Sequence, residues 1–185
     1  TDSVLSLEIF DDTLLAKFGR TYPTVCMDYE CRLPNVSSVA FDHAMSLRMG
    51  VKYLADLGHR RIAFLGRRAS KDPANRARAE GYGAAMDWLG LPRNPQWDPL
   101  AELIYVNVNI TAEAVVRMAR LPLHDRPTAI ISTEDIGLAY EALERVGVIA
   151  PRQMSLMTIS VKSEVPERDL RLNWTAVCMP AREMG

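Results

Sequence analysis

Short apolar runs alternate with amphipathic stretches along the chain. The runs are rich in Val, Ile and Leu, which is typical of buried strands in parallel sheets. They predict strands at residues 3–7, 22–28, 35–41, 61–66, 102–108, 126–132, 153–160 and 174–179. Between them, apolar residues at helical spacing predict helices at residues 11–19, 42–58, 72–90, 111–121 and 134–147. This alternation predicts an α/β fold in which crossovers connect parallel strands.

The ends of several predicted helices carry their own signals. Asp42 and Asp72 stand where a carboxylate would cap the first backbone N–H groups, and Pro73 takes the first helical position after Asp72. Gly58 and Gly147 stand where a residue in the left-handed conformation commonly ends a helix. These signals strengthen the prediction of three of the helices.

The same patterns predict which residues are buried. The strand at 3–7 is expected to be buried, and Gly19 is expected just past the end of the first helix. The inward face of the helix 42–58 is predicted to consist of Leu47, Val51, Leu54 and Leu57. That of the helix 72–90 is predicted to consist of Ala77, Gly81, Ala84 and Trp88.

The composition limits the possible functions. The chain has 185 residues, of which 48% are hydrophobic, enough for one large domain or two small ones. Its formal net charge is −1, so the chain lacks the excess of basic residues that a DNA-binding domain normally has. No apolar run approaches the length of a membrane span. The three cysteines, Cys26, Cys31 and Cys178, form no CxxC pair, which favours a reducing cytoplasm over a disulfide framework.

No catalytic or cofactor motif is present. The sequence has no P-loop, no GxSxG elbow and no HExxH, so we expect neither an enzyme nor a cofactor. GYGAAM (81–86) half resembles a dinucleotide-binding fingerprint, but its third glycine is missing and it lies inside a predicted helix, where close helix packing explains it. His59 is not expected to bind a metal, because His43 and His124 lie at spacings that match no ligand set.

The segment GHRRIAFLG (58–66) combines basic and apolar residues at one joint. We interpret it as a helix end, the start of a strand and a turn, with its two arginines in solvent. The wider basic cluster consists of Arg60, Arg61, Arg67, Arg68 and Lys71. A phosphate contact is the alternative to a solvated rim, but no aromatic residues are interleaved as in a nucleic-acid platform. The solvated rim is therefore favoured.

Polar residues stand where the predicted strands end. In parallel α/β folds, ligands bind beyond the carboxyl ends of the strands. The residues predicted to lie on this edge are Asp28, Arg67, Ser132, Glu134 and Ser160. Arg78 lies about two turns into the helix capped by Asp72, where its planar guanidinium would bind a carboxylate or paired hydroxyls. On the sequence alone, a surface ion pair explains Arg78 equally well.

Several stretches match one known family in the right order. The most specific is YLADLGHRRIAFLG (53–66), followed by the R-x-x-G-Y motif of RARAEGY (76–82). Supporting stretches are PTAIISTEDIGLAYEALERVG (127–147), PRQMSL (151–156) and TAVCMPAREMG (175–185). Over nearly its whole length the chain resembles the effector-binding domain of the lactose/galactose repressor (LacI/GalR) family.

The resemblance implies a periplasmic-binding-protein-like fold, with two parallel-sheet subdomains and a ligand cleft between them. The chain would enter the second subdomain near Phe41–Asp42 and return near Ala176–Val177. Residues 1–41 and 176–185 would then form an incomplete N-terminal subdomain, and residues 42–175 a C-terminal one. The family's DNA-binding helix-turn-helix domain is absent from this chain, so we expect it to be a piece of a longer protein.

The resemblance also implies an effector site. Arg78 matches the family arginine that contacts effector hydroxyls or a carboxylate, and Asp28 matches a cleft-facing position at a strand end. Asp135 matches the aspartate of an Asn-Asp pair whose asparagine is replaced by Glu134. Ser160 or Val161 stands where the family commonly has an aspartate that binds sugar hydroxyls. The expected effector is a sugar, or a sugar-like or acidic metabolite, and the loss of that aspartate favours an acidic one.

The function implied is that of the effector-sensing domain of a bacterial transcriptional regulator in the cytoplasm. Effector binding would close the cleft and shift the two subdomains. The partners implied are the small-molecule effector, a second copy in the full-length protein, and DNA only through the missing N-terminal domain, with no membrane. The alternative is a periplasmic sugar-binding protein of a transport system. An α/β enzyme has no motif to support it.

Overall fold

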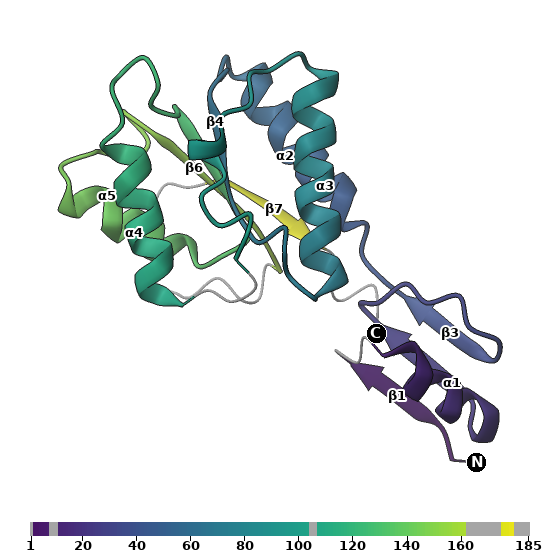
Figure 1. Ribbon diagram of the computed structural model, residues 1–185. Helices are drawn as coiled ribbons and strands as arrows, with labels where there is room; N and C mark the ends of the chain where they lie inside the picture. Colours follow the sequence, from purple (N-terminus) through teal and green to yellow (C-terminus); the bar gives the residue numbers. More distant parts are fainter. Residues whose placement is uncertain (1, 8–10, 104–106, 162–174, 180–185) are drawn as a thin grey trace.

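The computed structural model describes residues 2–7, 11–103, 107–161 and 175–179, which form two units (Figure 1). The first unit is a parallel sheet with one helix, made of β1 (Val4–Leu7), α1 (Asp12–Thr21), β2 (Thr24–Met27) and β3 (Val36–Val39). The second has a parallel sheet in the order β4 (Ile62–Leu65), β5 (Ala129–Ser132), β6 (Ser155–Val161) and β7 (Thr175–Met179). Its α-helices are α2 (His43–Asp56), α3 (Pro73–Trp88), α4 (Val108–Ala119) and α5 (Ile136–Arg145). The predicted α/β class is confirmed.

Helices cover the four-stranded sheet on both faces, because alternate side chains of a strand point to opposite sides. Phe64 and Met157 are buried against α2 and α3 on one face. Leu65 and Leu156 are buried against α4 and α5 on the other face. Figure 1 shows α2 and α3 on one side of this sheet and α4 and α5 on the other. Among the described residues, no helix combines the length and apolar character that a membrane crossing requires.

The predicted helix signals are confirmed. The side chain of Asp42 accepts a hydrogen bond from a backbone N–H in the first turn of α2 at 2.7 Å, and Asp72 does the same in α3 at 2.9 Å. Gly58 and Gly147 have φ angles of 95° and 72°, the left-handed conformation that stops a helix. These local contacts set where α2, α3 and α5 begin or end.

The joint at residues 58–66 connects the beginnings of β4 and β5. Nε of Arg61 donates to the carbonyl oxygen of Arg126 at 2.7 Å. Nδ1 of His59 lies 2.9 Å from Oγ1 of Thr128. The structural interpretation of this segment is confirmed. The expectation that Arg61 is only solvated is wrong, because its guanidinium donates a hydrogen bond to a backbone carbonyl in the segment just before β5.

Two predictions for the first unit are wrong, one about burial and one about the end of a helix. Leu5 and Leu7 are 68% and 63% exposed, because β1 pairs only with β2 in the described sheet and turns only Ser6 inward. Gly19 lies inside α1, not beyond its end. A Cβ added at Gly19 would lie 2.7 Å from Cγ2 of Val36, so the glycine lets α1 pack closely on β3.

The inward faces of α2 and α3 also differ in part from the prediction. Leu57 is 61% exposed because it lies beyond the end of α2, at its C-cap. Trp88 is 73% exposed, and Tyr82 and Met86 face the sheet instead. Gly81 does face inward, but toward α2, since an added Cβ would lie 2.7 Å from the Cα of Ala44. Close helix packing therefore explains the GYGAAM segment. The buried face of α3 is wider than the single stripe that the sequence predicted.

Two chain segments differ from the predicted element boundaries. Asn107 caps α4 and Val108 begins that helix, so the described part of the expected strand at 102–108 is not a strand. Residues 104–106 lie outside the described residues. β7 pairs with β6 from Thr175 to Met179, which places residues 176–179 in the four-stranded sheet and not with the first unit. Because the pairing continues to Met179, the chain does not leave this sheet at Ala176–Val177.

Candidate functional site

Asp28 and His43 connect the two units. Asp28 follows β2 with a φ of 56°, a left-handed conformation that aspartate adopts more readily than most residues. Its backbone N–H donates to the carbonyl oxygen of Val39 at 2.8 Å, so it lies where the chain leaves β3. His43 is the first residue of α2, and its Nε2 donates to Oδ1 of Asp28 at 2.8 Å. The His43 side chain is only 6% exposed, so this contact lies inside the joint between the units.

The surroundings of Asp28 keep its carboxyl ionised. Burial raises its pKa, but the hydrogen bond and charge of His43, together with the charge of Arg78, outweigh burial and hold the pKa below its usual range. An ionised carboxylate only accepts hydrogen bonds. The Asp28 side chain is 35% exposed, so it has room to accept a bond from a ligand as well.

Arg78 of α3 lies in the same region with its guanidinium mostly buried. Burial lowers its pKa, and three neighbouring carboxylates oppose that effect. These carboxylates belong to Asp72, Asp28 and Glu134. Nε of Arg78 is buried and has no hydrogen-bond partner among the described residues. An unmet buried donor costs about 1–3 kcal/mol, so a ligand acceptor placed there would be strongly favoured.

Glu134 and Arg67 come from neighbouring turns. Arg67 follows β4 and Glu134 follows β5, and because these strands are parallel neighbours their carboxyl ends lie side by side. Nε of Arg67 donates to Oε1 of Glu134 at 3.0 Å. The backbone N–H of Glu134 donates to Oγ of the buried Ser132 at 3.0 Å, which holds the turn in place. The pair thus completes a charged cluster of five side chains: Asp28, Arg67, Asp72, Arg78 and Glu134.

The structure brings together three of the five residues expected to bind the effector, namely Arg78, Asp28 and Glu134. Asp135 directly follows Glu134, and its side chain caps α5 by accepting from the backbone N–H of Gly137 at 2.8 Å. Ser160 is half-buried on β6 opposite Cys178 of β7, within the strand and not in a loop after it. Effector contact by these residues stays a prediction.

His43 was not predicted as a site residue. Its position directly after the helix cap Asp42, at the crossing between the units, is the signal that points to it. Its contact with Asp28 spans 15 positions of sequence and depends on how the segment between them folds. Asp72 keeps the capping role expected from the sequence and also faces Arg78.

A cavity of about 400 Å³ adjoins the charged cluster. Its lining includes Glu30 and Ser38 of the first unit, His43 at the crossing and Ala77 of α3. Ala77 precedes Arg78 in the chain, and His43 contacts Asp28, so the cavity lies directly beside the cluster. Its described lining residues do not include the charged cluster itself.

The cluster combines hydrogen-bond donors with acceptors. Two guanidinium groups lie among three carboxylates, so the positive charges are already compensated within the protein. Hydroxyl groups both donate and accept, which suits them to such a mixture. Among the described residues, no three His, Cys, Asp or Glu side chains gather closely enough to hold a metal ion. The mixture of donors and acceptors in the cluster suits a polar organic molecule.

A family model described as a periplasmic binding protein-like domain matches residues 51–185, well over half of the chain. The chain belongs to this family. The match confirms the predicted fold, and the two parallel-sheet units of this periplasmic binding protein-like domain agree with it. The charged cluster of the domain lies where strand ends from both units meet.

Named relatives of this periplasmic binding protein-like domain are regulators. The ribose operon repressor of Haemophilus influenzae is 25% identical over 166 residues, covering 88% of this chain and 47% of that protein. A LacI family regulatory protein from Chloroflexus aggregans has a TM-score of 0.84 at 21% identity, covering 100% of this chain and 65% of that one. A LacI family transcriptional regulator from Lactobacillus casei, solved with bound glucose, has a TM-score of 0.80 at 17% identity, covering 98% and 67%. The resemblance to the LacI/GalR family is confirmed, and the chain spans about half the length of the curated relatives that it matches.

Replacing His43 with glutamine is expected to raise the pKa of Asp28 toward its usual value of about 3.9, because the imidazole hydrogen bond and charge are lost. Since the folded-state pKa lies below the unfolded one, ionised Asp28 stabilises the fold above about pH 4. That contribution is lost as the pH falls through the lowered pKa. A carbon-13 NMR titration of the Asp28 carboxyl would measure the change.

The exposed His124 provides the control, because His124→Gln should leave the Asp28 titration unchanged. An Asp28 titration that is identical in wild-type protein and His43→Gln would contradict the assigned contact.

Proposed function

We propose that this chain is the effector-sensing domain of a LacI/GalR-type transcriptional regulator and that it binds a neutral sugar or polyol between its two units. The observation that carries the proposal is the charged cluster around Arg78, whose buried Nε has no partner among the described residues. The cluster draws on the carboxyl end of β2 in one unit and those of β4 and β5 in the other, where ligands bind in parallel α/β folds.

The charge balance of the cluster favours a neutral ligand over an anion. The sequence favoured an acidic effector, because Arg78 is retained while the usual aspartate is replaced near Ser160. In the structure, carboxylates of Asp28, Asp72 and Glu134 surround Arg78. A phosphate or carboxylate on the ligand would meet these like charges in a partly buried site, which is costly. Vicinal hydroxyls would instead donate to the carboxylates and accept from the guanidinium.

The named relatives support the same ligand class. One is a ribose operon repressor, and a solved LacI family regulator of the same fold holds glucose. Both names describe regulators, which also supports regulation over a transport receptor for this chain. The proposed sugar is therefore consistent with the charges of the cluster and with these proteins.

The position of the cluster provides a means of signalling. Asp28 belongs to the first unit, whereas Arg78 and Glu134 belong to the second. A ligand that bonds to both sides stabilises one relative placement of the units over others, by as much as its affinity differs between them. In a full-length regulator, this shift would bias the DNA-binding domains between operator-competent and incompetent arrangements.

A thermal-shift screen tests the proposal. Neutral pentoses, hexoses and polyols would be compared with sugar phosphates and uronic acids. A neutral ligand at 100 times its Kd should add about 2.7 kcal/mol of stability, a rise in Tm of roughly 5–10 °C for a chain of this size. Shifts by the anionic compounds alone would contradict the neutral class, and no shift with any compound would count against the proposed site.

This 185-residue chain alone is expected not to bind duplex DNA specifically. Its formal net charge is −1, which leaves little basic excess to neutralise phosphates. A gel-shift assay at two salt concentrations with random and palindromic duplexes would measure this. A sequence-dependent complex that weakens with salt would show that the domain itself reads DNA.

A further inference from the structure

The helix α2 has a second apolar face that the fold does not use. Its inner face is buried on the sheet, whereas Met45, Met49, Tyr53 and Leu57 form an outer stripe with one residue per turn. These four side chains are 44%, 57%, 48% and 61% exposed, in chain order. Their spacing extends the stripe over about 18 Å of α2 and its C-cap. Contiguous exposed apolar side chains of this kind mark interaction surfaces.

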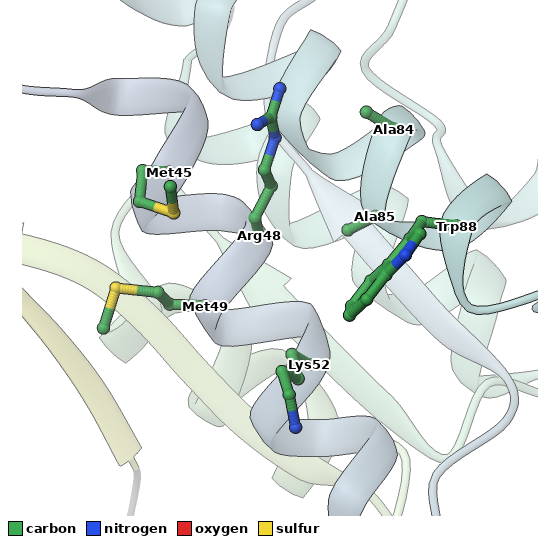
Figure 2. A pocket seen from close by; sticks show the side chains of 7 residues that line it. All are labelled: Met45, Arg48, Met49, Lys52, Ala84, Ala85 and Trp88. Atoms are coloured by element: carbon green, nitrogen blue, oxygen red, sulfur yellow. The ribbon is translucent and has the colours of Figure 1, made fainter.

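A groove deepens part of this stripe. Its volume is about 500 Å³, and it is lined by α2 residues together with Ala84, Ala85 and Trp88 of α3. Trp88 is 73% exposed and faces α2 from across the groove, while Met45 and Met49 lie on the other flank of α2 (Figure 2). Small alanines beside a large aromatic leave room for a side chain to enter. Flexible methionines adapt to varied apolar partners.

The charged residues of the groove have one sign. Arg48 and Lys52 line it, and no carboxylate does so among the described residues. Nothing in the described part of the chain bonds the Arg48 guanidinium. Lys52 donates to Asp56 at 2.7 Å, but both side chains are more than half exposed, and such pairs are worth at most about 1 kcal/mol. Both cations are thus available to an acidic partner.

The shape and charge of the groove fit a helix from another protein. An amphipathic helix inserts apolar side chains at intervals of three or four residues, which matches a straight stripe beside a groove. Acidic residues on its polar flank would face Arg48 and Lys52. A second copy of this chain fits less well, because a two-fold pairing would bring the same two cations of each copy toward each other.

We infer that the groove between α2 and α3 is a docking site for an amphipathic, acidic helical segment of a partner protein. The site lies on the outer face of these helices, formed by residues other than those of the charged cluster, so the inference does not depend on the proposed effector. It gives the domain a second interaction surface, one for a macromolecule.

The test uses two designed 14-residue helical peptides and the 185-residue chain carrying carbon-13 methionine methyl groups. Both peptides present the same leucine face, with glutamates on the flanks of one and lysines on the flanks of the other. The acidic peptide should shift the methyl signals of Met45 and Met49, assigned with Met45→Leu and Met49→Leu, and bind at least tenfold more tightly than the basic one. The double variant Arg48→Glu, Lys52→Glu should reverse this preference.

Arg152→Glu, which changes an exposed arginine elsewhere, is the matched control and should leave the preference unchanged. Equal binding of the two peptides, or no methyl shift at millimolar peptide, would overturn the inference. Shifts of the Met45 and Met49 signals that depend on protein concentration without peptide would overturn it too, because the occupant would then be a second copy.

Discussion

Replacing Arg78 with lysine is expected to weaken effector binding by more than tenfold, or about 1.4 kcal/mol. Lysine keeps the positive charge among the carboxylates of the cluster, but it loses the planar fork that bonds two adjacent hydroxyls at once. It also removes the buried Nε donor, which in the wild-type protein has no partner among the described residues. Titration calorimetry with the sugar found by thermal shift would measure the change.

Arg76→Lys is the matched control, because Arg76 lies on the same helix and is exposed. Its replacement should change the affinity by less than about twofold, since its side chain only reaches the carbonyl of Lys71 at 3.3 Å. An unchanged affinity in Arg78→Lys would return Arg78 to a purely structural role.

Replacing Gly81 with alanine is expected to destabilise the second unit by about 2–3 kcal/mol. The added Cβ would lie 2.7 Å from the Cα of Ala44, and backbone atoms of α2 cannot move aside without separating the two helices. The loss corresponds to a fall in Tm of roughly 4–12 °C for a chain of this length. Thermal and urea unfolding followed by circular dichroism would measure it.

Gly83→Ala is the matched control two positions along the same helix. There the added Cβ would lie 3.2 Å from the end of the flexible Arg93 side chain, which can give way. Because alanine favours a helix over glycine by up to about 1 kcal/mol, this variant should be as stable as the wild-type protein or slightly more so. Equal stability of both variants would show that α2 and α3 are not tightly packed at Gly81.

The parts of the fold predicted from the sequence depend on local physics. Asp42 and Asp72 cap helices through hydrogen bonds to the first turn of the same helix, and Gly58 follows α2 in the left-handed conformation that stops a helix. The wrong predictions depend on what an element packs against. Gly19 lies within α1, where the missing Cβ lets Val36 approach, and Trp88 is exposed because α3 turns neighbouring residues toward the sheet.

The candidate site was predicted only in part, because some of its contacts depend on tertiary structure. Asp28 and Glu134 follow strands, so the parallel topology alone brings them to the facing edges. The sequence did not predict His43 as a site residue, because its role depends on the contact with Asp28 of the other unit. The charge around Arg78 also depends on tertiary structure, since Asp72 and Glu134 are distant in the sequence from Asp28 yet all three surround one guanidinium.

The most direct test of the central claim is the Nε–H signal of Arg78 in nitrogen-15 NMR spectra during a titration with the sugar found by thermal shift. The signal would be assigned by its absence in Arg78→Lys. If the sugar binds at the charged cluster, the signal should shift in proportion to saturation, because the buried Nε–H gains an acceptor. A saturable sugar complex that leaves this signal unmoved would contradict the proposed site.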